Sequence, residues 1–481
     1  MKTIRKVTLL LLTIIFISSC SDSFLDLRSK EATDARSAIV DLETMEYAVY
    51  GLYALLQHSD YYNRTFYLLP ELMSDNVYLS SRRRFYTPFE RYEVQADNGY
   101  VEDTWNQIYR VIVNSNIIIQ EGSGLEVSDS NTAEKQAMVG EAYAIRALAH
   151  FDLSRLYAQP YNFTEDASHL GIPLVSESSI NVDEVTFPSR NTVGEVYEAV
   201  IRDLEQAIQR LPESVPGEPS SYKGRITLNA AKALLSRVYL YMEDWENSEK
   251  LATEVIDSGQ YSLLSTGNLI SEFSERHNSE SIVEIVNTFS DNSSSNSVAY
   301  YYHQDGYGDV LASWDFYNSY SSTDVRRNFM EIGDRSGGGG EEDVPLITKF
   351  KKFQGNFEQD VIFIRLAEVY LNRAEARAHL GKDAEAIADL TTIAERSDPE
   401  VMIDPSLSGQ ELINRILLER RKELAFEGQR LFDLTRNGKS FVKYHTGGDS
   451  TNINYPNDKT ILPIPESELI INDNLTQNPE Y

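Results

Sequence analysis

The stretch Leu-Gly-Lys-Asp-Ala-Glu-Ala-Ile at residues 380–387 decides the class of fold, because it joins two segments with helical patterns. The first segment runs over residues 365–380, and the second from Asp383 to about Glu395. Gly381 lies between them, and glycine is the residue that most often ends a helix at a turn. We therefore predict a helical hairpin. One hairpin cannot bury its apolar face alone, so we expect it to stack on others.

A second stretch has the same character. Asp-Trp-Glu-Asn-Ser-Glu at residues 244–249 follows a predicted helix that begins after Thr227 and precedes another that ends at Gly259. Both turns resemble the turn and second helix of a tetratricopeptide repeat. The long separation between the two copies predicts interrupted repeats and not a regular solenoid.

The first half of the chain also predicts helices. Asn131 and Glu134 have the spacing of a capping box, and so do Thr192 and Glu195. A proline closes the helix that follows each pair. The first of these helices carries apolar stripes on two sides, which predicts that it packs between neighbours.

Long irregular stretches separate the predicted helices. Residues 59–100 are rich in Tyr, Arg and Asn, and residues 286–345 contain three consecutive tyrosines. Loops of this length are uncommon in compact domains and are often functional. The alternation over residues 281–286 predicts a short strand. The fold class that we predict is mainly α, with tetratricopeptide-like helical hairpins, long irregular loops and minor β structure.

The first twenty residues have the pattern of an exported lipoprotein. Basic residues precede an apolar run over residues 7–17, which is shorter than the ~20 apolar residues that span a bilayer. Ile-Ser-Ser-Cys at residues 17–20 matches a lipobox. Cys20 is the only cysteine and cannot pair within its own chain. We predict that residues 1–19 are removed and that Cys20 is lipidated; the alternative is an ordinary signal peptide with a chance cysteine.

The charge of the chain argues against two classes of partner. The formal net charge is −30, and residues 1–19 carry three basic and no acidic side chains, so the charge of the mature chain is −33. A surface of this sign repels nucleic acid and anionic membrane. We therefore expect no direct nucleic-acid partner, and membrane attachment only through the lipid.

Motifs of catalysis and of metal binding do not occur in the sequence. No two of the seven histidines have the i, i+4 spacing of a zinc helix, and there is no Gly-x-Ser-x-Gly elbow. Residues 337–340 are four glycines without the Gly-Lys-Ser/Thr of a phosphate loop, which predicts a flexible tether. We predict a protein that is not an enzyme and that holds no cofactor or metal. The 74 acidic residues leave a glycoside hydrolase as an alternative, although no pair stands out.

Two charged clusters have alternative interpretations. Three consecutive arginines at residues 82–84 form either a solvated loop that offsets nearby acids or a contact for an acidic ligand or partner protein. Arg420, Arg421, Glu423 and Glu427 place two basic and two acidic side chains close together in the sequence. We expect these four to form an internal network of salt bridges and caps.

Five segments together resemble the SusD/RagB family of outer-membrane lipoproteins. They follow one another in the family's order over nearly the whole mature chain. The resemblance divides the chain into an N-terminal SusD-like part over about residues 22–215 and a C-terminal RagB/SusD part over about residues 216–481. The segments are residues 105–110, 140–151, 171–174, 419–428 and the ending at 462–465 and 477–479.

The resemblance implies a function as well as a helical fold. In that family a cell-surface lipoprotein captures an extracellular nutrient, mostly a glycan, and delivers it to a TonB-dependent outer-membrane transporter of the SusC type. It performs no chemistry. A peptide-capturing RagB-like receptor and a tetratricopeptide-like interaction scaffold remain as alternatives.

The resemblance and the loops also supply candidate ligand-binding residues. Ser-Asp-Asn at residues 74–76 resembles the family's early loop, where a carboxylate helps to bind sugar hydroxyls, so that Asp75 and Asn76 are candidates. Trp105 follows this loop, and it is either a platform or a core residue of the next helix. Sugars present apolar C–H faces, for which flat aromatic rings are suited. The six aromatic candidates of the middle region, of which we expect two or three to face the ligand, are Tyr300, Tyr301, Tyr302, Trp314, Tyr317 and Tyr320.

Overall fold

The computed structural model describes residues 38–81, 85–177, 186–335, 341–352 and 357–481. The predicted signal peptide of residues 1–19, Cys20, the arginines at 82–84 and the glycines at 337–340 lie outside the described residues. Within the described part, no helix is both long enough and apolar enough to cross a membrane.

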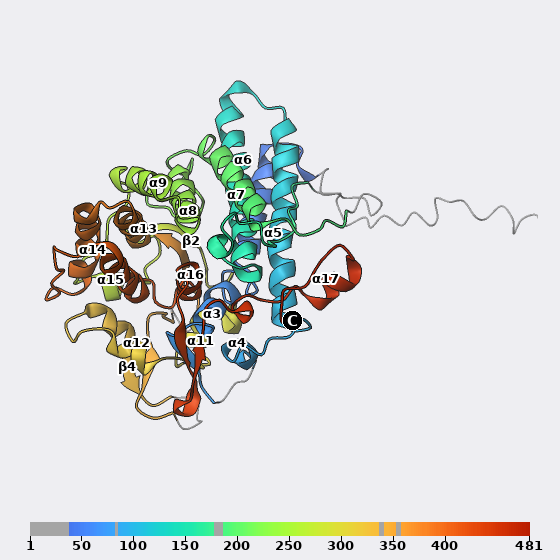
Figure 1. Cartoon of the computed structure of the whole chain (residues 1–481). Coiled ribbons are helices and arrows are strands. Elements are labelled where there is room, and N and C mark those ends of the chain that lie inside the picture. Colours follow the sequence, from blue (N-terminus) through green and yellow to red (C-terminus); the bar gives the residue numbers. More distant parts are fainter. Residues whose placement is uncertain (1–37, 82–84, 178–185, 336–340, 353–356) are drawn as a thin grey trace, which may run out of the picture.

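A group of long helices forms one side of the molecule. Helices α5 and α6 pack side by side, α7 packs against α6, and α2 packs against both α5 and α6 (Figure 1). Helix α6 is buried along most of its length, as the two apolar stripes predicted. The bounds of this group are α2 Leu42–Leu56, α5 Gly99–Gly124, α6 Thr132–Tyr157 and α7 Val193–Ile208.

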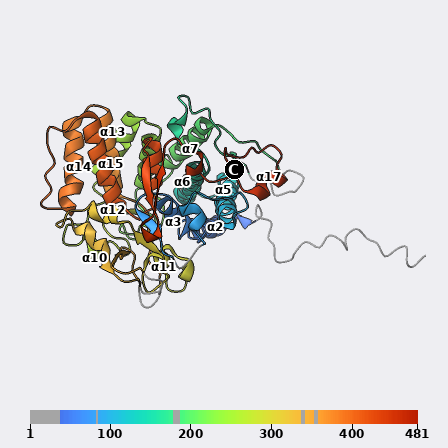
Figure 2. The ribbon, with the colours of Figure 1, turned by 60° about the horizontal axis from the view of Figure 1, so that its bottom comes forward.

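The two predicted hairpins are present and lie against each other. Asp244 caps α9, because its side chain accepts a hydrogen bond from the backbone N–H of Asn247. Gly381 takes the left-handed conformation between α13 and α14, with φ +70°. Helix α9 packs directly on α13, so the interruption in sequence is closed in space (Figures 1 and 2). The bounds are α8 Leu228–Tyr241, α9 Trp245–Asp257, α13 Leu366–His379, α14 Asp383–Ser397 and α15 Gly409–Glu423.

The segments outside the long helices form small sheets and short helices. A four-stranded antiparallel sheet has the order β1-β3-β5-β4, and two further sheets pair β2 with β6 and β7 with β8. The predicted strand near residue 283 is therefore confirmed as β2. The strands are β1 Val77–Leu79, β2 Ser281–Ile285, β3 Val310–Ala312, β4 Met330–Gly333, β5 Val344–Ile347, β6 Val361–Arg365, β7 Phe441–Tyr444 and β8 Ser450–Ile453. The short helices are α3 Thr65–Leu72, α4 Thr87–Glu90, α10 Leu269–Glu272, α11 Val298–Tyr302, α12 Trp314–Asn318, α16 Arg430–Arg436 and α17 Glu466–Ile471. The predicted class, mainly α with minor β, is confirmed.

The two predicted capping boxes have different outcomes. Thr192 and Glu195 form a capping box at the start of α7, with both reciprocal hydrogen bonds. The box predicted at Asn131 and Glu134 is wrong, because the Asn131 side chain makes no capping hydrogen bond. A 3-10 turn over Asp129–Asn131 precedes α6 and gives Asn131 a helical backbone. An N-cap side chain needs extended backbone to reach the free N–H groups.

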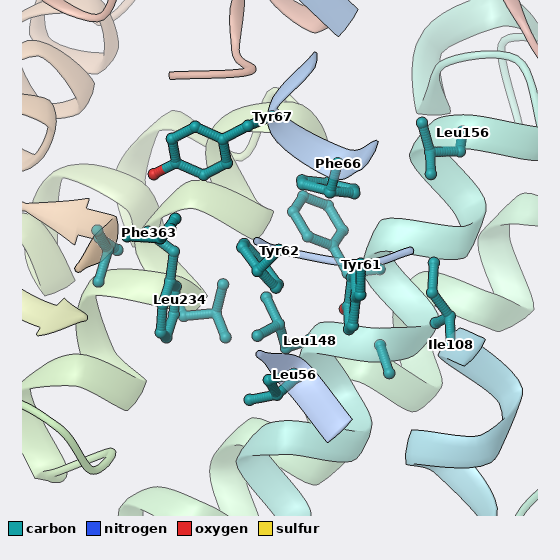
Figure 3. Close-up of a cluster of buried hydrophobic side chains, with 14 of the residues drawn as sticks. Leu56, Tyr61, Tyr62, Phe66, Tyr67, Ile108, Leu148, Leu156, Leu234 and Phe363 are labelled. Atoms are coloured by element: carbon teal, nitrogen blue, oxygen red, sulfur yellow. The ribbon is translucent and has the colours of Figure 1, made fainter. Parts of the chain in front are cut away.

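Tyrosine is a major component of the core. Tyr61 and Tyr62 lie with Phe66 and Tyr67 among aliphatic side chains from α2, α5, α6 and α8 (Figure 3). The hydroxyls of Tyr61 and Tyr62 both donate to Oδ2 of Asp152, each at 2.7 Å. Their polar tips are thus satisfied inside the protein, as buried tyrosine requires. The abundance of tyrosine in this chain therefore reflects packing as well as surface.

An ion-pair network holds the C-terminal helices to the rest of the fold. Glu423 accepts from Arg326 Nη1 at 2.8 Å and from Arg365 Nη1 at 2.7 Å, and it also pairs with Arg396. Burial alone would raise the pKa of Glu423, but these three guanidinium groups lower it well below its usual value. Arg420 pairs with Asp433, so the predicted internal network is confirmed for Arg420 and Glu423.

Glu427 also belongs to this network, whereas Arg421 does not. Glu427 accepts from Lys349 Nζ at 2.6 Å and from Arg365 Nη2 at 2.8 Å. The guanidinium of Arg421 points to a different part of the molecule, at the opposite side of α15, where it meets Asp75 and Asp315. Arg421 is salt-bridged as expected and its side chain is 10% exposed, but its partners are Asp75 and Asp315 and not the network around Glu423.

Candidate functional site

A groove of about 390 Å³ lies between the C-terminal helices and the loop that contains Asp75. This volume falls in the range of small-molecule sites. Its apolar side chains come from α15, α16 and β7, and its charged side chains are Asp75, Asp315, Arg421 and Arg430 with Lys439 and Asp433. The apolar residues are Leu417, Leu418, Leu434, Phe441 and Val442. Tyr444, the last residue of β7, also lines the groove.

Strand pairing brings two distant segments to this groove. Strand β1 pairs antiparallel with β3, with Val77 opposite Ala312. The residues that precede β1 therefore lie beside those that follow β3. Ser313 extends the ladder, because its N–H donates to the Asn76 carbonyl at 2.8 Å and its hydroxyl donates to the Asp75 carbonyl at 2.8 Å. Asp75 and the start of α12 are thus fixed to each other.

Asp75 is held by two arginines. Arg430 donates to it through Nε and Nη2, at 2.7 and 2.8 Å, and Arg421 Nη2 lies 3.2 Å from Oδ2. Burial would raise the pKa of Asp75, but Arg430 and Arg421 lower it to about 2. A bidentate pair of this kind fixes the plane of the guanidinium. Asp75 lines the groove, where it orients the two arginines, and its contact with a ligand stays a prediction.

Asn76 lies behind the groove. Its side chain is buried, donates to Glu71 Oε2 at 3.1 Å and accepts from Arg421 Nε at 2.9 Å. Burial raises the pKa of Glu71 to about 7. The expectation that Asn76 touches ligand is therefore corrected: both ends of its amide are engaged inside the protein, and it supports Arg421.

Helix α12 contributes Asp315 to the groove and exposes the aromatic side chain that precedes it in the sequence. Its first residue, Trp314, is 45% exposed, and the second, Asp315, lines the groove and accepts from Arg421 Nη2 at 2.9 Å. The ring of Tyr317 meets that of Trp314 edge to face, at 5.6 Å between centroids. The guanidinium of Arg327 lies 4.4 Å from the Tyr317 centroid. Trp314 is exposed and Tyr317 is partly buried beside it, and contact of either ring with a ligand stays a prediction.

The structure buries the other predicted aromatics. Trp105 is 3% exposed and packs on Tyr109 and Tyr157, with both centroid distances 4.9 Å. Tyr302 is fully buried and stacks on Phe350 at 5.0 Å. The rings of these residues face the core because α5 and α11 turn them inward, so the expectation of ligand contact is corrected for them. The buried members of the predicted set are Trp105, Tyr301, Tyr302 and Tyr320, and Tyr300 is half-buried against Phe357.

Several groove residues were missed by the sequence analysis. Phe441, Val442 and Tyr444 lie on β7, which gave no recognisable strand pattern, because the buried Lys443 interrupts its apolar residues. The sequence analysis did not single out Arg430 either. Arg430 could be found from the sequence only by pairing an acidic residue of the early loop, Asp75, with a basic residue of a late helix.

The groove offers hydrogen-bond donors whose positions are fixed. Nη1 of Arg421 and Nη1 of Arg430 have no hydrogen-bond partner among the described residues, while their other nitrogens bind Asp75, Asn76 and Asp315. Lys439 Nζ donates to Asn414 Oδ1 at 3.2 Å. Asp75 and Asp315 neutralise the two arginines, so this part of the groove suits polar groups without net charge. No cluster of metal-ligating side chains occurs in the part of the chain that the structure describes.

Comparisons with known proteins give consistent matches. Residues 23–240 match a family described as starch-binding and associating with the outer membrane, and residues 345–481 match the SusD family. The SusD-like protein P2 of Formosa agariphila is 25% identical over 523 residues, which cover 98% of each chain. The starch-binding protein SusD of Bacteroides thetaiotaomicron is 31% identical over 128 residues, 26% of this chain and 22% of that protein.

Solved structures agree with these sequence matches. The crystal structure of a putative sugar-binding protein from Bacteroides vulgatus superposes with a TM-score of 0.84 at 29% identity, over 92% of this chain and 99% of the other. A SusD superfamily protein from Bacteroides thetaiotaomicron gives a TM-score of 0.82 at 28% identity, over 92% and 100%.

Proposed function

The chain belongs to the SusD/RagB family of carbohydrate-binding proteins associated with the outer membrane, and from this premise we propose that it binds an extracellular oligosaccharide in the groove beside Trp314. The observation that carries the proposal is the combination of a half-exposed indole with two arginines that Asp75 holds in place. It acts by binding and release, without catalysis.

The chemistry of the groove fits a neutral sugar. The indole face accepts the C–H face of a pyranose, and an aromatic contact contributes about 0.5–1.5 kcal/mol beyond its buried area. Guanidinium N–H groups donate to hydroxyl oxygens, each with a net contribution of about 1 kcal/mol. A few such contacts correspond to a Kd in the micromolar to millimolar range, since 1 mM is about −4.1 kcal/mol. Capture of this strength permits release.

The attachment and the partner complete the proposal. Lipid on Cys20 tethers the protein to the outer membrane with its body outside the cell, and the bound sugar passes to a TonB-dependent transporter of the SusC type. Co-purification of the native protein with a large outer-membrane barrel tests the partnership. Metabolic labelling with palmitate tests the lipid, with Cys20→Ala as the control, and protease treatment of intact cells tests the orientation.

Calorimetry of the purified protein against a panel of oligosaccharides tests the binding itself. Trp314→Ala removes the exposed indole, and we expect Kd to rise roughly tenfold or more, because a large apolar contact is lost together with its aromatic component. The matched control is Tyr47→Ala, which removes an aromatic side chain that is 59% exposed on α2. Equal affinity of Trp314→Ala and wild type would contradict the assignment of the groove.

One observation favours a peptide as a second candidate ligand. Strand β7 lines the groove and, among the described residues, pairs only with β8. An extended peptide can add to such an edge through backbone hydrogen bonds. Binding of unrelated short peptides in the same calorimeter, insensitive to Trp314→Ala, would favour this candidate over the sugar.

A further inference from the structure

A second cavity of about 320 Å³ lies next to the groove, on the other side of Lys439. It is formed where the two tetratricopeptide-like hairpins meet the C-terminal segment. The start of α9, the end of α13, the first turn of α15 and the residues that follow α16 all contribute to its wall. None of the candidate residues of the sequence analysis belongs to it.

The cavity contains an aromatic platform. The Trp245 indole and the His379 imidazole stack in parallel, with centroids 3.8 Å apart and an interplanar angle of 3°. Burial lowers the pKa of His379, so its imidazole is neutral at neutral pH and the stacked pair carries no charge. Tyr241 and Tyr455 also line the cavity. Trp245 is only partly buried, so the pair is not explained by core packing alone.

Planar polar groups surround the platform. Asn162 Nδ2 donates to Glu243 Oε1 at 2.6 Å and to the Arg436 carbonyl at 2.8 Å, which fixes the orientation of both side chains. Gln410 and Asn437, which carry amide side chains, also line the cavity. Carboxylates and amides beside an aromatic face are the groups that bind hydroxyls around an apolar sugar ring.

Lys439 connects this cavity with the groove. Its side chain lines both spaces, and its ammonium group donates to Asn414, which lines the groove. We propose that the second cavity binds a further part of the same oligosaccharide, so that one chain lies over Trp314, passes Lys439 and reaches Trp245. This inference rests on the proposed function and extends it, since it assigns the protein a preference for long chains.

The experiment compares two chain lengths of each sugar. Calorimetry is performed with the trisaccharide and heptasaccharide of the malto-, cello-, xylo- and manno- series. For the series that wild type binds, we expect Trp245→Ala to raise Kd of the heptasaccharide roughly three- to tenfold and to leave Kd of the trisaccharide unchanged. Trp314→Ala weakens both lengths and serves as the comparison.

A second variant guards against misfolding of Trp245→Ala. Gln410 is exposed on the wall of the cavity, and Gln410→Trp fills the space without removing a packed side chain. We expect the same loss, confined to the heptasaccharide. Heptasaccharide affinities of both variants equal to wild type, or equal losses at both lengths, would overturn this inference alone. Absence of binding by wild type to every series would overturn the proposed function and this inference with it.

Discussion

Replacement of Asp75 by Asn tests whether one carboxylate holds both halves of the site together. Asp75 lies before β1, whereas its partners Arg421 and Arg430 belong to the C-terminal helices α15 and α16. The side chain of Asp75 is 10% exposed, and those of its partners are 10% and 13% exposed. Asp75→Asn keeps the shape of the side chain and removes its charge, so Arg430 loses its paired carboxylate in a poorly solvated place and Arg421 keeps only the exposed Asp315.

The expected loss of stability follows from two independent estimates. The pKa of Asp75 is about 2 in the folded protein against the usual 3.8, and at ~1.36 kcal/mol for each pKa unit this difference corresponds to roughly 2 kcal/mol. Removal of one partner from a buried ion pair costs ~3–5 kcal/mol. The amide oxygen of Asn still accepts one hydrogen bond. We therefore expect the free energy of unfolding to fall by roughly 3 kcal/mol.

Urea unfolding at several pH values measures this loss and its pH dependence. Because the folded pKa of Asp75 is lower than the unfolded one, its stabilising contribution is complete above about pH 4 and is lost as the pH falls towards 2. The difference in unfolding free energy between wild type and Asp75→Asn should thus be constant from pH 7 to pH 5. It should narrow between pH 4 and pH 2, where wild type also loses the charge.

The control is Asp315→Asn, which removes the other carboxylate beside Arg421. The Asp315 side chain is 47% exposed, and exposed ion pairs contribute no more than ~1 kcal/mol. Equal losses in the two variants would refute the argument that burial of Asp75 determines the effect. An unchanged urea midpoint for Asp75→Asn, or a difference from wild type that does not narrow in acid, would refute the ion pair itself.

Two further variants test the interior. Glu423→Gln leaves Arg326, Arg365 and Arg396 without their shared carboxylate, and we expect a loss of ~3–5 kcal/mol in urea unfolding at pH 7; a loss below ~1 kcal/mol would contradict the network. Tyr302→Phe removes a buried hydroxyl that has no hydrogen-bond partner among the described residues, so we expect unchanged stability or a gain of up to ~1 kcal/mol in thermal unfolding. A clear loss for Tyr302→Phe would mean that the hydroxyl has a partner.

The hairpins could be predicted from the sequence because their signals are local. In one hairpin, Gly381 follows α13 in the left-handed conformation. In the other, the Asp244 side chain caps α9 by accepting a hydrogen bond from the backbone N–H three residues further along. These signals involve residues that are close together in the sequence, so they can be recognised without knowledge of the tertiary structure. The stacking of α9 on α13 was expected in kind, but the long insertion between the hairpins hid that they are neighbours.

The groove could be predicted only in part, because its contacts join distant residues. Asp75 and Arg430 are 355 residues apart in the sequence, and Arg421 and Asn76 are 345 apart. Residue type alone does not distinguish Trp314 from Tyr302, since both are aromatic residues of one irregular region. Their exposure depends on partners such as Phe350, which no local pattern reveals.

The residues that hold the groove together differ from the residue that we propose to touch the ligand. The loop before β1 and helix α12 are tied to α15 and α16 through Asp75, Asp315 and the two arginines, so their positions depend on the helical body. Trp314 takes no part in these ties, and its indole is half exposed. We therefore expect a change at Trp314 to alter ligand binding at little cost in stability, and a change at Asp75 to reduce both ligand binding and stability. Ligand preference in this architecture can shift through α12 while the arginine pair remains in place.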